Sequence, residues 1–379
     1  MAHDNSSDDL DALIGELNSR VERSSESSDF SLQCEQWIDR VIESKGSDLF
    51  LVVGSVPLMK VNGSLVPASD QLLDETDIEA ALFPLLPPHS LEQYRRLGRA
   101  DSSFKIRARR FRINLHRERG RIAAAIRLLP IKVPTLSSLN LPPEIEQLSI
   151  LKAGLVIIGG STGAGKTTTL AALVEAINVR ERVHVVTVED PIEYEHTNNL
   201  SLIEQVEIHV DAPDFPTALR GAVRQAPDVL VIGEMRDPES MRIALSAAET
   251  GHLVLSSIHA NDIGAVIGRI CDSFPNERQN TIRQELSHAL SAVMVQSLIP
   301  RTNGGRVPAV ELLNISYGAR QHIRKNALQH LDQEITITRK SGSISYEESL
   351  ARLVKDGQIS HADGLQRARH PEEFEIFLR

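Results

Sequence analysis

One short stretch, residues 160–167, constrains the fold and chemistry of this chain more than any other. It reads Gly-Ser-Thr-Gly-Ala-Gly-Lys-Thr and matches every fixed position of the phosphate-binding loop pattern G-x-x-x-x-G-K-[ST]. The apolar run 155–158 before it predicts a strand buried on both faces, and Leu170, Val174 and Ile177 after it have helical spacing. Because the motif and both flanks agree, we predict a strand, a phosphate loop and a helix in that order.

The residue types of this loop suit ATP with Mg²⁺. Glycines let backbone N–H groups converge on phosphate oxygens, and the following helix directs its positive end at the anion. Lys166 is predicted to reach the β- and γ-phosphates, and the Thr167 hydroxyl to ligate Mg²⁺. The alternative, a glycine-rich turn with a chance lysine, is disfavoured by the flanks. The predicted nucleotide-binding residues are Gly160, Ser161, Thr162, Gly163, Ala164, Gly165, Lys166, Thr167 and Thr168.

Composition limits the classes of function that remain. The chain has 379 residues, which favours two domains, and its 41% apolar and 24% charged residues are ordinary for a soluble globular protein. A net charge of −10 argues against general binding to nucleic acid. Cys34 and Cys271 do not have the spacing of a zinc site, and no apolar run reaches the ~20 residues that span a bilayer. The acidic N-terminus does not resemble a signal peptide, so we expect a cytoplasmic protein that reaches a membrane only through partners.

The order of segments predicts a tail and two domains. The first 30 residues are rich in Ser, Asp and Glu, which predicts disorder, with a short docking helix over 10–21 as the alternative. Asn62-Gly63 between two apolar runs predicts a β-hairpin. The expected bounds are 1–30 for the acidic tail, 31–130 for a small α+β domain, 131–148 for a proline-rich linker and 149–379 for the nucleotide-binding domain with a helical C-terminal region.

Arginines concentrate in residues 106–121 of this acidic chain. Parts of the stretch alternate, as in 111–115, so it predicts an arginine-studded strand, paired with the run 122–129 that carries Arg127. Aromatic residues that could stack bases do not recur among the arginines, which disfavours a nucleic-acid surface. A solvated face is the simpler interpretation for most of them, and some are candidates for contacts to a nucleotide phosphate.

Apolar runs separated by helical stretches predict a mostly parallel sheet covered on both faces. Ligands of such sheets bind at the carboxyl ends of the strands. Residues 281–298 are expected to form one long helix, and Ser345 is expected to begin another, which Gly357 ends. The strand-like runs are 155–158, 183–188, 229–232 and 252–258.

Carboxylates follow two of these runs. A usual Walker B strand carries an acidic residue where Gly233 stands, so Glu234 is the candidate general base that polarises the attacking water. The turn 189–193 holds three carboxylates, which repel one another and favour a divalent cation nearby. A solvated acidic turn is the alternative. The candidate Mg²⁺ ligands are Thr167, Glu189 and Glu193.

Two histidines, His252 and His259, bracket the last apolar run. A histidine in such a place is more often a satisfied structural group than a catalytic one. No cluster of further ligands accompanies them, so the sequence gives little support for a metal site there.

Four stretches together resemble the secretion ATPases that power type II secretion and type IV pili. Residues 160–169, 189–194, 227–237 and 248–260 are similar, in order and spacing, to the Walker A, Asp box, Walker B and His box of that superfamily. The resemblance extends from about residue 31 to the C-terminus, and is greatest to the pilus retraction ATPases. The stretches that support this subtype are 47–49, 110–114, 233–237 and 247–253.

The resemblance implies a small PAS-like N-terminal domain and a RecA-like ATPase core, assembled as a homohexamer. It implies an active site shared between neighbouring subunits and a partner that is the inner-membrane platform protein of the pilus machine. By this resemblance Arg112 and Arg127 contact nucleotide phosphates, and Glu234 is the catalytic base. Glu193 helps to place water and Mg²⁺. His252 and His259 couple the nucleotide state to domain position.

Some positions depart from the retraction pattern. Retraction ATPases normally show Ala-Ile-Arg-Asn-Leu-Ile-Arg near the C-terminus, where residues 319–324 read Ala-Arg-Gln-His-Ile-Arg; Phe50 and Ala260 also replace a usual His and Thr. A companion retraction ATPase or an assembly motor are therefore alternatives within the superfamily. A small-molecule kinase and a regulator without motor activity are disfavoured, the first by the His box and the second by intact Lys166 and Glu234.

Overall fold

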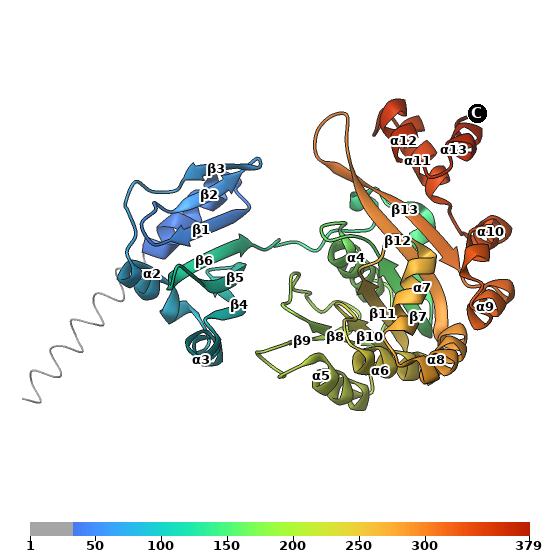
Figure 1. Cartoon of the computed structure of the whole chain (residues 1–379), viewed down its shortest axis with the longest axis horizontal. Coiled ribbons are helices and arrows are strands. Elements are labelled where there is room, and N and C mark those ends of the chain that lie inside the picture. The colour runs from blue at the N-terminus through green and yellow to red at the C-terminus, as the bar shows by residue number, and fades with distance from the viewer. Residues whose placement is uncertain (1–32) are drawn as a thin grey trace, which may run out of the picture. The chain divides into compact units, whose positions relative to one another are not determined.

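The computed structural model describes residues 33–379 in two compact units (Figure 1). Described residues up to Ile131 form the first unit, and Lys132–Arg379 form the second. The tail expected over 1–30 and its alternative docking helix lie outside the described residues. Throughout the part that is described, no helix is long and apolar enough to cross a membrane.

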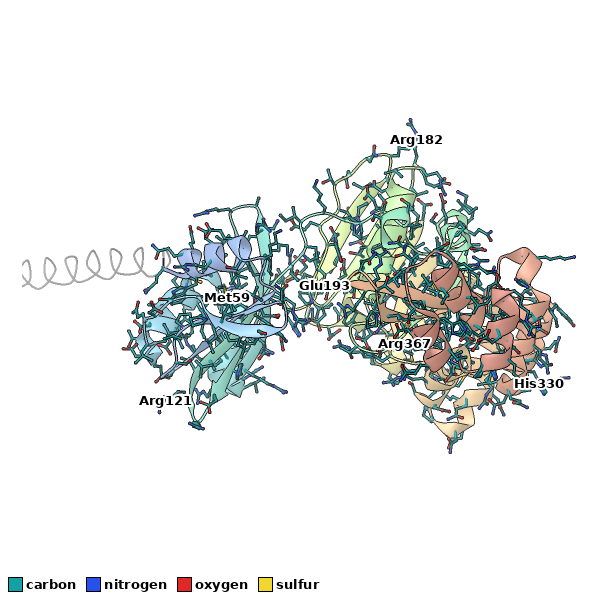
Figure 2. All side chains as sticks on the ribbon, turned by 90° about the horizontal axis from the view of Figure 1, so that it is seen from above. Met59, Arg121, Arg182, Glu193, His330 and Arg367 are labelled. Atoms are coloured by element: carbon teal, nitrogen blue, oxygen red, sulfur yellow. The ribbon has the colours of Figure 1, made fainter. Side chains whose placement is uncertain are left out.

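The first unit is an antiparallel sheet with helices packed on one face. The strand order is β3-β2-β1-β6-β5-β4. The helix over 33–43 and helices α2 and α3 bury the inner face, where Leu49 and Ile113 are almost inaccessible. Met59 points into this core, whereas Arg121 at the start of β6 points to solvent (Figure 2). The elements are β1 Asp48–Val52, β2 Leu58–Val61, β3 Ser64–Pro67, α2 Glu75–Leu82, η1 Phe83–Leu85, α3 Pro88–Leu97, β4 Arg99–Ile106, β5 Arg109–Glu118 and β6 Arg121–Leu128.

The predicted hairpin is confirmed at the turn between β2 and β3. Asn62 and Gly63 have φ angles of 50° and 85°. Two successive residues with positive φ are what a type I′ turn requires, and Asn followed by Gly adopts that conformation at low cost. The arginine-rich strand and its partner are also present, as β5 and β6.

The second unit is built on a sheet in which strand order is β13-β12-β7-β11-β10-β8-β9. Every neighbouring pair is parallel except β12 and β13. The mostly parallel sheet expected from the alternating pattern is therefore confirmed. The strands are β7 Gly154–Gly159, β8 His184–Glu189, β9 Leu202–Glu207, β10 Val229–Ile232, β11 Leu253–Ile258, β12 Leu290–Pro300 and β13 Arg306–Asn314.

Helices cover both faces of this sheet. On one face Leu155 and Ile157 of β7 pack with residues of α5, α6, α7 and α8, and on the other Val156 and Ile158 pack with α4 and η3. Burial on both sides explains why β7 is apolar along its whole length. The helices are η2 Ser137–Leu139, η3 Pro143–Ile150, α4 Lys166–Asn178, α5 Phe215–Ala222, η4 Val223–Gln225, α6 Pro238–Glu249, α7 Ile263–Asp272, α8 Asn276–Ala289, α9 Tyr317–Arg324, η5 Leu328–His330, α10 Leu331–Ile337, η6 Arg339–Ser341, α11 Tyr346–Lys355, α12 His361–Arg367 and α13 Pro371–Leu378.

The single helix expected over 281–298 is wrong in its second half. Helix α8 ends at Ala289, and the chain continues directly into β12, which pairs with β7 on one side and β13 on the other. Val293 and Met294 of β12 face opposite apolar layers. A short run that is apolar on both faces does not distinguish a buried strand from a buried helix, so only the pairing decides.

The segment expected to be a linker contains a short helix that packs on the second unit. In the segment expected to be a linker, η3 buries Ile145 and Leu148 against α4, because these are apolar residues beside an apolar helix face. The expected domain bounds stay predictions.

Near the C-terminus, Ser345 is the N-cap of α11, accepting a hydrogen bond from the Glu348 N–H at 3.2 Å, and Gly357, with φ of 65°, follows the end of this helix.

Candidate active site

Residues 160–165 form the loop between β7 and α4, as the motif predicts. Gly165 has a φ of 87° and is the N-cap of α4, where no side chain caps the first N–H groups. A Cβ atom on Gly160 would lie 2.5 Å from the carbonyl oxygen of Gln296, so only glycine fits there. A glycine loop that leaves helix N–H groups uncapped is the donor arrangement that a phosphate chain requires. These residues therefore fit a nucleoside phosphate.

Lys166 is buried at the mouth of this loop. Its side-chain Nζ donates to the carbonyl oxygens of Gly160 and Ser161 at 2.9 and 3.0 Å, and it lies 3.2 Å from Nδ1 of His259. Burial lowers the pKa of Lys166, and the negative charge of Glu234 opposes that shift. The ammonium is thus held by the loop itself, close to where the phosphate oxygens would bind.

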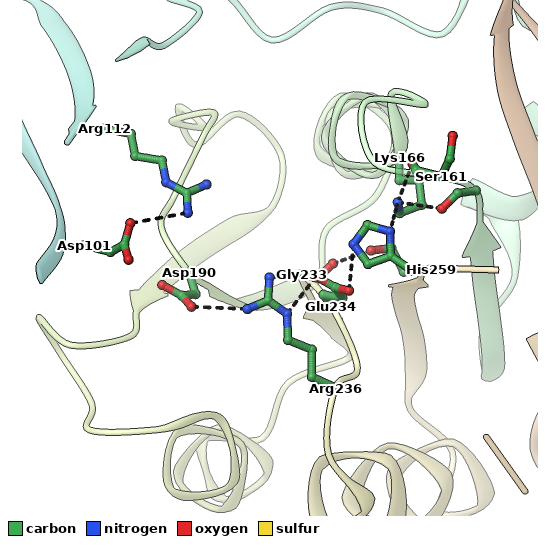
Figure 3. Close-up of polar contacts among 11 residues, drawn as sticks. Asp101, Arg112, Ser161, Lys166, Asp190, Gly233, Glu234, Arg236 and His259 are labelled. Atoms are coloured by element: carbon green, nitrogen blue, oxygen red, sulfur yellow. Dashed lines mark hydrogen bonds and ion pairs between the residues drawn. The ribbon is translucent and has the colours of Figure 1, made fainter. Parts of the chain in front are cut away.

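His259 joins the lysine to the predicted base (Figure 3). Its Nε2 lies 3.0 Å from Oε1 of Glu234, while its Nδ1 faces Lys166. A neutral imidazole that donates from Nε2 and accepts at Nδ1 satisfies both contacts. Because β7, β11 and β10 are parallel neighbours, their carboxyl ends bring these three residues to one edge of the sheet.

The backbone next to Glu234 is hydrogen-bonded to residues of the strands on both sides, β11 and β8. The Ser257 hydroxyl donates to the Gly233 carbonyl at 2.7 Å, and the Gly233 N–H donates to the Val188 carbonyl at 2.9 Å. A Cβ on Gly233 would lie 3.4 Å from that same carbonyl oxygen and 3.5 Å from the Glu189 Cα. The carboxylate of Glu234 therefore extends from a fixed point, with only 17% of its side chain exposed.

Arg236 is a site residue that sequence reasoning did not single out. Its guanidinium contacts Oε2 of Glu234 at 2.8 Å and lies 3.9 Å from Asp190 (Figure 3). It stands in the stretch 233–237 that carries the family resemblance, but an exposed arginine after a strand has no local signal of its own. In the structure it links Glu234 to the acidic turn after β8.

The carboxylates of the acidic turn after β8 lie in different environments. Glu189 is turned inward, where it accepts hydrogen bonds from the Thr187 hydroxyl at 2.7 Å and the Gln205 amide at 3.1 Å. Burial raises its pKa to about 7, and those hydrogen bonds counteract the shift. Glu193, by contrast, is only half-buried.

No group of three or more His, Cys, Asp or Glu side chains in residues 33–379 is arranged to hold a metal ion. Thr167 is half-buried in the first turn of α4, and the next residue, Thr168, shares a hydrogen bond of 3.0 Å with the Tyr194 hydroxyl. A Mg²⁺ ion bound through phosphates needs only one or two protein ligands, so this donor set fits it. The roles predicted for Thr167, Glu189 and Glu193 in Mg²⁺ binding stay predictions.

His252 is not brought to the phosphate loop. It precedes β11, and its carbonyl accepts from the Gly154 N–H at the start of β7, at 3.0 Å. Its Nδ1 lies 3.0 Å from the Ala247 carbonyl and 3.3 Å from the Thr250 hydroxyl, within the turn after α6. Six residues of extended strand separate it from the other histidine, a distance of ~20 Å.

The two predicted arginines lie side by side in the first unit. Arg112 and Arg127 are directly opposite each other on β5 and β6. Arg112 is 3.8 Å from Asp101, and Nε of Arg127 donates to Asp48 at 2.8 Å. Their side chains are 38% and 66% exposed, so both guanidinium groups reach the surface of that unit.

A phosphate loop after a central strand of a parallel sheet, with a lysine and a carboxylate at the same edge, defines a P-loop ATPase with a RecA-like core. The family model described as type II/IV secretion system protein matches residues 131–330, and the chain belongs to this family. It is an ATPase of that family.

Relatives extend the similarity over both units. The type IV pilus retraction ATPase PilT of Pseudomonas aeruginosa is 34% identical over 86% of this chain and 96% of its own length. The type IV pilus ATPase PilU of the same species is 33% identical over 92% of each chain. A crystal structure of the pilus retraction motor PilT with bound ADP matches with a TM-score of 0.81 and 36% identity, covering 89% of this chain and 98% of that chain.

Proposed function

We propose that this chain is the subunit of a hexameric motor that hydrolyses ATP to drive retraction of type IV pili. The observation that carries the proposal is the extent of the match to PilT, which takes in 96% of that protein's length. The contacts from Lys166 through His259 to Glu234 support an active enzyme, because each group that ATP hydrolysis needs is present and connected.

A second candidate is a companion or assembly ATPase of the same machine. The match to PilU, over 92% of this chain, favours it as much as identity alone can. The altered residues at 319–324 lie in α9. Motor direction therefore has to be decided by experiment.

Within the site, Lys166 offsets phosphate charge and Glu234 accepts the proton of the attacking water. His259 donates to one oxygen of the base and Arg236 to the other, so the carboxylate is oriented by two donors. The same histidine accepts from Lys166, which makes it the residue best placed to sense whether the lysine is engaged with phosphate.

Mg²⁺ would be held by the Thr167 hydroxyl and by phosphate oxygens, where it would neutralise the charge that develops on the transferred phosphoryl group. Glu189 and Glu193 are the candidate carboxylates for further contact with this ion, and Glu189 also accepts hydrogen bonds from Thr187 and Gln205. His252 is assigned a coupling role only, through the turn that it holds between α6 and β11.

Arg112 and Arg127 are assigned as fingers that a neighbouring subunit supplies to the nucleotide. Their adjacent positions on β5 and β6 and their exposed guanidinium groups support this assignment. Such a residue stabilises charge in the transition state and needs no other chemistry. The ring would act at the cytoplasmic side of the inner membrane, bound there through the platform protein, without membrane insertion and without nucleic acid.

Deleting the gene and scoring twitching and surface pili tests the function. Loss of movement with excess pili supports retraction, and loss of pili supports assembly instead. Complementation with Glu234→Gln separates the motor from a scaffold, since a scaffold would be restored by a chain that cannot hydrolyse ATP. Purified protein that forms no ring in nucleotide, or has no ATP turnover, would contradict the motor.

A further inference from the structure

Gln296 lies directly beneath the phosphate loop, in the strand that sequence reasoning assigned to a helix. It belongs to β12, where the preceding residue, Val295, is in register with Gly159 of β7. Gln296 is 4% exposed. Its side chain therefore has no solvent to bind, and both ends of its amide need protein partners.

The two ends of the amide bind the phosphate loop and the helix that follows it. Nε2 donates to the Ala164 carbonyl at 2.7 Å, and Oε1 accepts from the Thr169 hydroxyl at 2.8 Å. The Ala164 carbonyl can only accept, so the amide orientation is fixed by its partners. Ala164 is inside the loop and Thr169 is in the first turn of α4, so one side chain ties the loop to the helix that follows it.

The bond to Ala164 sets the direction of the next peptide group. In a planar trans peptide the C=O and the following N–H point in opposite directions. The Ala164 carbonyl points at Gln296, so the Gly165 N–H points away from it, toward the open side of the loop. A phosphate loop needs its N–H groups turned toward the anion and its carbonyls turned away from it, and this contact imposes that orientation on the Ala164–Gly165 peptide.

The glycines at both ends of the loop fit around the same residue. A Cβ on Gly160 would lie 2.5 Å from the Gln296 carbonyl oxygen, and a Cβ on Gly165 would lie 2.8 Å from its Nε2. The close approach of the β12 backbone therefore accounts for Gly160 independently of any bound anion, and the φ of 87° accounts for Gly165, where a Cβ would also displace the Gln296 amide. The phosphate loop is thus closely packed against Gln296 at both of its ends.

We propose that Gln296 is a positioning residue that presets the phosphate loop for nucleotide binding, by holding the Ala164–Gly165 peptide with its N–H toward the phosphate. The role rests on nucleotide binding by this loop and goes beyond the motor function proposed above. It does not touch the nucleotide, and acts through the orientation of one backbone donor.

Two substitutions of similar shape test the proposal. Gln296→Met removes both hydrogen bonds. Gln296→Glu keeps the acceptor for Thr169 but turns a carboxylate oxygen toward the Ala164 carbonyl, so it repels the peptide that the parent holds. Ser297→Ala is the matched control, because the Ser297 hydroxyl pairs with Tyr346 of α11 rather than with the loop.

The measurements are the Kd for ADP by calorimetry and the unfolding temperature without nucleotide. We expect Gln296→Met to weaken ADP binding by about tenfold, the loss of one hydrogen bond to a charged group, and Gln296→Glu to weaken it further. The Ser297→Ala variant should bind ADP within about twofold of the parent, since its contact lies outside the loop. A role in fold stability alone predicts a lower unfolding temperature in both Gln296 variants, with the ADP affinity of the folded protein unchanged.

Binding of ADP by both Gln296 variants within about twofold of the parent would overturn the proposal, as would an equal loss in Ser297→Ala. If the Gln296 variants do not fold, Thr169→Val removes the bond that holds the Gln296 amide from the α4 side, and it should weaken ADP binding in the same measurements. Failure of the parent itself to bind ADP would instead contradict the assignment of the loop.

Discussion

Replacing Arg369 by alanine should destabilise the fold, because Arg369 is the partner of the buried carboxylate of Glu311. Arg369 lies between α12 and α13, and its Nη1 donates to both oxygens of Glu311 on β13, at 3.2 and 3.1 Å. Its Nη2 donates to the Asn261 carbonyl at 2.8 Å, two residues after His259. Glu311 is 4% exposed, and burial raises its pKa to about 7 although Arg369 opposes the shift.

The cost of the substitution should depend on pH. The folded pKa of Glu311 is above its ordinary value of 4.5, so its contribution favours folding most at low pH and is lost as pH rises. In the parent that loss ends near pH 7, where Arg369 accommodates the ionised carboxylate. Without the arginine the pKa rises further, so the loss should continue at about 1.4 kcal/mol per pH unit above pH 7.

Below this range the carboxyl is protonated in both proteins. The variant then lacks the hydrogen bonds that Arg369 donates, which are worth about 1–3 kcal/mol in total, and its contact with the Tyr346 ring. At about pH 8 the difference in unfolding free energy should therefore exceed that at pH 6 by about 1–1.5 kcal/mol.

Urea unfolding followed by far-ultraviolet circular dichroism, at several pH values and without nucleotide, measures this difference. The control is Glu311→Gln in the Arg369→Ala background, in which the added pH dependence should vanish because the titrating group is gone. A cost of Arg369→Ala that is the same at every pH would refute the reasoning. It would assign the effect to packing, since the guanidinium also lies 5.0 Å from the centre of the Tyr346 ring.

Other substitutions separate the roles at the nucleotide. Glu234→Gln should keep ATP binding and lower steady-state turnover by about 10²-fold or more, the scale of general-base loss, and near-normal turnover would remove it from that role. Lys166→Ala should instead weaken binding of a non-hydrolysable ATP analogue, because it removes the charge next to the phosphates. Unchanged affinity would show that assigning binding to Lys166 and hydrolysis to Glu234 is wrong. Arg112→Ala and Arg127→Ala should each fold and bind nucleotide but lose turnover by about 10³-fold, and mixing either with Glu234→Gln should restore part of it if the site is shared. Full activity of either arginine variant would exclude that residue as a finger.

Local sequence patterns were sufficient for the elements whose signals are local. The phosphate loop between β7 and α4, the Asn62-Gly63 hairpin and the start of α11 at Ser345 depend on turn chemistry and capping within a few residues. The position of Glu234 was predicted for the same reason, since a carboxylate two residues after a buried strand stands at its carboxyl end.

What the sequence left open was decided by pairing between distant segments. Residues 290–300 are apolar on both faces, so they became a strand only because β7 and β13 lie on either side. That pairing places Gln296 under the loop, 132 residues away from Ala164 in the chain. In the same way, strand order rather than sequence brought His259 to Lys166 and left His252 at the opposite edge of the sheet. Contacts of this kind leave no periodic or turn signal in the chain, because each depends on which strands become neighbours.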